Sequence, residues 1–139
     1  MVDAERVEAR ILRLEQTIER LDAVRAKGEA AYLADAELRA MTERWLQLAI
    51  QACIDLGAQL VSEQSVPPPS DYAGVFAALG EAGVLPDELA QRLGQAARQR
   101  NILVHLYLEI DDRSVFASLD RLDDLRQFAA VVQRLADEA

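Results

Sequence analysis

The sequence predicts an all-α protein, folded as an up-and-down bundle of about five helices. The chain of 139 residues is rich in alanine and leucine, which favour helices. Aromatic residues make up only 5% of it, and the β-branched residues that favour strands are sparse. Apolar residues recur at alternating spacings of three and four, which is the period of an amphipathic helix. These three observations together favour a helical bundle over any fold that contains a sheet.

The length and composition predict a single domain spanning residues 1–139. Hydrophobic residues form 51% of the chain and charged residues 28%, which exceeds the apolar content of disordered proteins. The one cysteine, Cys53, lies in an apolar run and is expected to pack as a small hydrophobic residue. A lone cysteine can form no disulfide within the chain, which fits a reducing compartment.

The first half of the chain predicts two long helices. Residues 3–27 carry one apolar stripe and end at Gly28, which favours the end of a helix. Residues 35–62 carry two apolar stripes, so this second helix should be central and mostly buried.

The second half predicts three more helices after a stiff connector, Val66 to Ser70, that contains three consecutive prolines. A short helix capped by Ser70 or Asp71 should run to about Leu79. A fourth should run from Pro86 to about Leu108, and a last helix, capped by Asp111 or Asp112, should carry an apolar stripe from Val115 to Leu135.

The charge of the chain restricts its partners. A net charge of −9 and a pI near 4.6 argue against nonspecific coating of nucleic acid, which depends on many Lys and Arg contacts to phosphate. The segment 89–108 is the exception, because it holds three arginines and the only histidine and no carboxylate. No apolar run is long enough to span a membrane, and no leader pattern precedes the first helix, so we expect a cytoplasmic protein.

Arg100 interrupts the apolar stripe of the fourth predicted helix. The stripe consists of Leu89, Leu93, Ala96, Arg100, Leu103 and Tyr107. A cation in such a position needs a carboxylate partner, an anionic ligand or a cleft open to water. Asp55, in the most apolar part of the second helix, is one candidate partner for Arg100.

His105 and Tyr107 allow both a structural and a chemical interpretation. His105 is the one side chain here whose ordinary pKa, about 6.5, allows proton transfer near neutrality in either direction. A lone histidine among apolar neighbours is also common in cores and interfaces, and a tyrosine in a stripe commonly packs there. On an ideal helix His105 and Arg100 point about 140° apart. His105 and Glu109 are too few ligands for a metal site within one chain, so we expect none.

The segment Arg100-Asn-Ile-Leu-Val-His105-Leu-Tyr107 has the form R-x-x-x-x-H-x-Y. Together with the following Leu-Glu-Ile-Asp, it resembles the HepT-like branch of the HEPN superfamily (higher eukaryote and prokaryote nucleotide-binding). The resemblance extends to a long first helix, the Ile54-Asp55 step, the proline connector before Tyr72 and the Gly-Val-Leu-Pro turn at 83–86.

This resemblance implies a helical homodimer in which two motifs face a shared cleft. It also implies a metal-independent endoribonuclease that is the toxin of a type VII toxin–antitoxin pair and needs no cofactor. The antitoxin would be an MntA-like minimal nucleotidyltransferase that transfers AMP from ATP to the motif tyrosine. Carried onto this sequence, Arg100 and His105 are the catalytic pair and Tyr107 is the modified residue. Asn101 also matches the family and would bind phosphate or orient His105.

The residue types suit that chemistry. Metal-free RNA cleavage needs a proton acceptor, a proton donor and a positive charge near the phosphate. One histidine cannot easily supply both proton steps, so a second subunit would complete the site. Arg98 is a further candidate for binding RNA, with Arg92 and Arg113 beside it at the rim of the cleft. Two alternatives remain at this point: a non-catalytic helical module that binds a nucleotide or a nucleotidyltransferase, and a purely structural helical dimer.

Overall fold

The structure is a computed structural model that describes residues 4–104 and 110–138. Within these ranges every regular element is a helix, which confirms the predicted all-α class. The elements are α1 (Ala4–Lys27), α2 (Glu29–Ala34), α3 (Ala36–Ser62), α4 (Tyr72–Glu81), α5 (Asp87–Val104), α6 (Asp112–Ser118), the 3-10 helix η1 (Leu119–Arg121) and α7 (Leu122–Glu138).

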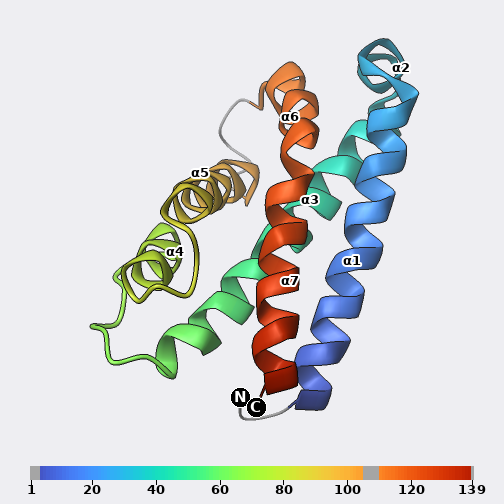
Figure 1. Cartoon of the computed structure of the whole chain (residues 1–139). Helices are drawn as coiled ribbons and strands as arrows, with labels where there is room; N and C mark the ends of the chain where they lie inside the picture. The colour runs from blue at the N-terminus through green and yellow to red at the C-terminus, as the bar shows by residue number, and fades with distance from the viewer. Residues whose placement is uncertain (1–3, 105–109, 139) are drawn as a thin grey trace.

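The long helices α1, α3 and α7 form the body of the bundle (Figure 1). Helices α1 and α7 pack side by side, and α3 crosses behind them and contacts both. The shorter α4 and α5 pack tightly against each other and together cover the other side of α3. Helix α3 is therefore the central helix, as its two apolar stripes predicted.

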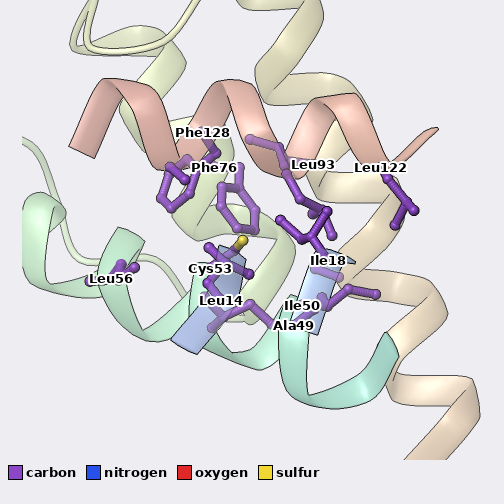
Figure 2. Packing of buried hydrophobic residues seen from close by; sticks show 14 of the residues in the cluster. Leu14, Ile18, Ala49, Ile50, Cys53, Leu56, Phe76, Leu93, Leu122 and Phe128 are labelled. Atoms are coloured by element: carbon purple, nitrogen blue, oxygen red, sulfur yellow. The ribbon is translucent and has the colours of Figure 1, made fainter. Parts of the chain in front are cut away.

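One apolar core joins these helices. Figure 2 shows Phe76 of α4 meeting Phe128 of α7 above Cys53 of α3. The two rings pack edge to face with their centroids 5.6 Å apart, a favourable aromatic geometry. Gly57 allows α4 to approach α3, because a Cβ atom at this position would lie 2.8 Å from Val75 Cγ1. The core therefore fixes α4, and with it α5, on α3.

The predicted helix boundaries need two corrections. Residues 29–34, which lie between the first two predicted helices, form the short helix α2 after Gly28, whose φ of +90° favours glycine. The last predicted helix is divided by η1, although its apolar stripe runs through Leu119 and Leu122 without a break. The expectation that the fourth helix runs to Leu108 lies partly outside the described residues, which follow α5 to Val104.

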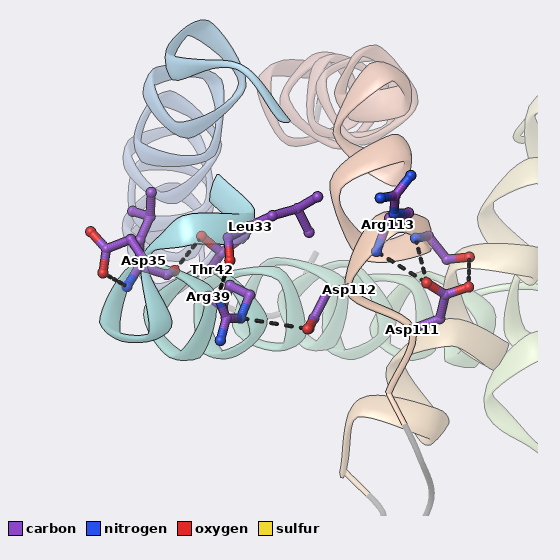
Figure 3. A network of polar contacts seen from close by, with 9 residues as sticks. Leu33, Asp35, Arg39, Thr42, Asp111, Asp112 and Arg113 are labelled. Carbon is purple, nitrogen blue, oxygen red and sulfur yellow. Dashed lines mark hydrogen bonds and ion pairs between the residues drawn. The ribbon is translucent and has the colours of Figure 1, made fainter. Parts of the chain in front are cut away.

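Polar contacts hold α2, α3 and α6 together at one end of the bundle (Figure 3). Arg39 of α3 donates a hydrogen bond to the carbonyl of Leu33 and forms an ion pair with Asp112 at 3.5 Å. Asp111 caps α6 by accepting hydrogen bonds from the amides of Arg113 and Ser114, at 3.1 and 3.3 Å. These contacts fix the chain where it re-enters the described structure at residue 110. No helix in the described ranges is long and apolar enough to cross a membrane.

Candidate functional site

The candidate site is centred on Arg100, just before the last turn of α5. Of its described neighbours along the same stripe, Leu93 and Leu103 are buried, at 1% and 5% exposure, and Ala96 is partly buried. Arg100 itself is half-buried. The sequence pattern therefore placed this guanidinium correctly, at the edge of the core and not on a solvated face.

Arg100 contacts an aromatic ring. Its guanidinium carbon lies 5.3 Å from the centroid of the Tyr72 ring, within the range of a cation–π interaction. Its Nη1 donates a long hydrogen bond, 3.4 Å, to the side-chain oxygen of Asn101. Its Nε is enclosed and has no hydrogen-bond partner in the described part of the chain. The ion pairs found among those residues include none made by Arg100.

The hypothesis that Asp55 pairs with Arg100 is wrong. Asp55 is exposed and accepts a hydrogen bond from Gln51 Nε2 at 2.8 Å, one turn earlier in α3. It lies in a groove with Arg10 and Arg13 of α1, on the side of α3 that packs on α1. No carboxylate of the described residues is thus paired with Arg100, which satisfies one requirement for binding an anion.

The other arginines proposed for the rim of a cleft differ in their surroundings. Arg92 is turned toward α7, where its Nε lies 2.8 Å from Asp124, so its charge is already balanced. Arg113 lies on α6 and is 3.9 Å from Glu29. Arg98 is exposed and forms no ion pair with a described residue; it lines a depression between α4 and α5. Among the described residues, Arg92 and Arg113 therefore have a carboxylate partner and Arg98 has none.

His105, Tyr107 and Glu109 lie outside the described residues, so the structure does not test their predicted roles. Asn101, the residue after Arg100, is exposed and one turn from the end of α5 at Val104. Cys53 is fully buried as expected, and burial raises the pKa of its thiol.

Tyr72 is the contact that sequence reasoning missed. It is the first residue of α4 and lies 28 positions before Arg100, so no local spacing relates the two. The sequence signals at this point, a proline connector and a capping Asp71, predicted only that a helix begins here. The packing of α4 on α5 brings the ring to the guanidinium.

Comparison with known proteins shows which family the chain belongs to. The model of the family described as ribonuclease HepT-like matches residues 14–132. A tRNA nuclease HepT from Aphanizomenon flos-aquae is 33% identical over 104 residues, which cover 75% of this chain and 69% of that protein. An mRNA nuclease HepT from Shewanella oneidensis is 26% identical over 125 residues, covering 89% and 93%.

Solved structures show the same fold. One is a tri-AMPylated HEPN toxin of Shewanella oneidensis in complex with an MNT antitoxin, with 25% identity, coverage of 96% and 99%, and a TM-score of 0.85. Another, a toxin–antitoxin structure with AMP-PNP, has 25% identity, coverage of 95% and 99%, and a TM-score of 0.82. The fold and the R-x-x-x-x-H motif thus define a HEPN-type helical bundle of the ribonuclease class. Within that class, the chain belongs to the ribonuclease HepT-like family.

Proposed function

We propose that this protein is a metal-independent endoribonuclease and the toxin of a HepT/MntA-like toxin–antitoxin pair. The observation that carries the proposal is Arg100, a half-buried cation on an apolar stripe with no carboxylate paired to it among the described residues. An uncompensated guanidinium at the edge of a core costs stability, which favours a role in binding an anion. It begins the R-x-x-x-x-H-x-Y segment that the family resemblance rests on.

The proposed reaction is attack of a ribose 2′-hydroxyl on the adjacent phosphorus. His105 accepts the proton of that hydroxyl, the new O–P bond forms, and the bond from phosphorus to the 5′-oxygen breaks. A proton donor then gives a proton to the leaving 5′-oxygen. Arg100 stabilises the phosphate as negative charge builds on its oxygens. The chemistry needs no cofactor, and ATP enters only as the AMP donor of the antitoxin.

A homodimer would supply the second histidine for the proton donor. Tyr72, which contacts Arg100, is 42% exposed, and Ile102, two residues further along α5, is 48% exposed. These exposed apolar side chains favour an interface formed by α5 and the start of α4. Light scattering at micromolar concentration should give twice the mass of one chain, and a monomer would remove the composite site.

RNA would be bound only near the motif. Asn101 and Arg98 are exposed on the same helix as Arg100 and can donate hydrogen bonds to phosphate. The remainder of the protein is acidic, so it offers no broad attraction for RNA. We place this activity in the cytoplasm, where RNA is abundant and a free thiol such as Cys53 stays reduced.

Silencing would occur by transfer of AMP to the hydroxyl of Tyr107. The related Shewanella oneidensis toxin is AMPylated and bound to an MNT antitoxin. An adenylate two residues from His105 would bring a phosphodiester anion to Arg100 and occupy the path of the substrate. Intact mass should rise by AMP units with a cognate MntA-like enzyme and ATP, and RNA cleavage should stop. If Tyr107→Phe gains AMP equally well, the modified residue is another one.

Cleavage assays test the catalytic assignment. His105→Ala and Arg100→Ala should each lower the rate of RNA cleavage by at least two orders of magnitude while the protein remains folded. Arg134→Ala is a matched control, because Arg134 is exposed on α7 and forms no ion pair with a described residue. Full activity of both motif variants would instead support a non-catalytic binding module.

A further inference from the structure

The stacking of Tyr72 on Arg100 has no role in the function proposed so far. The ring lies 5.3 Å from the guanidinium carbon, and Tyr72 is 42% exposed. Arg100 Nε is enclosed and makes no hydrogen bond within the described residues. The contacts of the guanidinium with described residues are therefore the face of the Tyr72 ring and one long hydrogen bond, to Asn101.

An aromatic ring and a carboxylate hold a guanidinium in different ways. A carboxylate accepts hydrogen bonds from the guanidinium edge and neutralises its charge, so it competes with a phosphate for the same donors. A ring attracts the cation through the electrons of its face and leaves both the charge and the N–H donors of the edge available. The second arrangement suits an arginine that must bind a phosphate transiently.

Tyr72 is itself held in place by the chain around it. Asp71 caps α4 by accepting a hydrogen bond from the amide of Gly74 at 2.7 Å. A Cβ atom at Gly74 would lie 3.1 Å from Pro69 Cβ, so the proline connector packs closely on the first turn of α4. Proline has a restricted backbone, and a capped first turn resists fraying. The ring of Tyr72 is thus presented from a constrained position.

We propose that Tyr72 is a positioning residue, whose ring holds the Arg100 guanidinium in orientation for the RNA phosphate without neutralising it. The inference rests on the proposed catalytic role of Arg100. The face of the Tyr72 ring positions the guanidinium, and the Tyr72 hydroxyl has no role.

Two substitutions separate the ring from the rest of the side chain. Tyr72→Phe keeps the aromatic face and should retain kcat within twofold. Tyr72→Leu keeps an apolar side chain without the π face and should lower kcat on the order of tenfold, with KM for RNA changed less than twofold. The control is Arg20→Gln, which removes a second arginine that lies over an aromatic ring in the described structure, at 5.8 Å from the Trp45 ring centroid, and should leave kcat unchanged.

The split between kcat and KM decides between positioning and direct contact with RNA. A higher KM with unchanged kcat in Tyr72→Leu would mean that the ring contacts the substrate, which overturns the proposal. Equal activity of the leucine variant and the wild type would overturn it too, as would equal losses in the phenylalanine and leucine variants.

A second readout does not depend on RNA cleavage. In an NMR spectrum of arginine Nε–H groups, the Arg100 signal, identified by its loss in Arg100→Lys, should be shifted by the ring current of Tyr72. Tyr72→Leu should remove that shift, Tyr72→Phe should keep it, and Arg20→Gln should leave it unchanged. If the wild type cleaves no RNA, the proposed function fails while this measurement still tests the contact. An Arg100 signal unmoved by Tyr72→Leu overturns the inference itself.

Discussion

Replacing Arg100 by methionine should stabilise the protein while it abolishes activity. Methionine is unbranched, has a similar helix propensity and fits the apolar stripe that Arg100 interrupts. In the wild type, the stripe neighbours Leu93 and Leu103 are buried and Arg100 Nε is enclosed without a hydrogen-bond partner in the described structure. The substitution removes that unsatisfied donor and adds apolar contact with the core.

The expected change in the free energy of unfolding is the sum of two stabilising contributions and one destabilising contribution. An enclosed polar group without a partner costs about 1–3 kcal/mol, and the lower end applies because Arg100 is only half-buried. Loss of the stacking on Tyr72 costs about 0.5–1 kcal/mol. Methionine regains roughly 1 kcal/mol from burial of its apolar atoms. The net gain is about 1 kcal/mol, which raises Tm by about 4 °C for a domain of this size.

Thermal unfolding followed by circular dichroism, with urea denaturation beside it, measures this change. Arg92→Met is the matched control on the same helix. Arg92 is paired with Asp124, whose side chain is 14% exposed. Removing the arginine leaves this largely buried carboxylate without its partner and should lower the free energy of unfolding by about 1–3 kcal/mol. If Arg100→Met is less stable than the wild type, Arg100 is a structural residue and the reasoning fails.

Two further predictions concern the core and pH. Gly57→Ala should lower the free energy of unfolding by about 1–3 kcal/mol, because the added Cβ meets Val75 Cγ1 at 2.8 Å; an unchanged urea midpoint would show that α4 can move away from α3. The pKa of Tyr32 is raised to about 12, first by burial and then by the negative charges of Glu43 and Asp112. An unfolded tyrosine ionises near pH 10, so this contribution to stability is complete below about pH 10 and is lost as pH rises toward 12. Tyr32→Phe should weaken the fall in the free energy of unfolding between pH 10 and 12. If the variant loses stability over this range as the wild type does, other groups cause the pH dependence.

The helical fold could be predicted from sequence because the stripes of α1 and α3 follow the helical period over many turns. The short α2 was missed because six residues after a glycine contain too little periodicity to distinguish a helix from a turn. The division at η1 was missed for the opposite reason, since Leu119 and Leu122 continue the stripe through a change in helix type. Both errors concern local backbone geometry, which the apolar pattern does not encode.

The site could be predicted only where it depends on one helix. The position of Arg100 on a buried stripe followed directly from spacing within α5. Its partner did not, because Asp55 and Tyr72 lie on other helices and the order in which helices pack cannot be inferred from one sequence. Asp55 lies on the side of α3 that packs on α1, while Tyr72 begins the helix that packs on α5.

The chemical ends of the RNA fragments test the central claim most directly. A short RNA is incubated with the purified wild-type protein in excess EDTA, and the fragments are analysed by mass spectrometry. Attack by the 2′-hydroxyl predicts fragments that end in a 2′,3′-cyclic phosphate and begin with a 5′-hydroxyl, and none from the His105→Ala variant. Fragments with 3′-hydroxyl and 5′-phosphate ends, or loss of cleavage in EDTA, would contradict the metal-free mechanism assigned to Arg100 and His105.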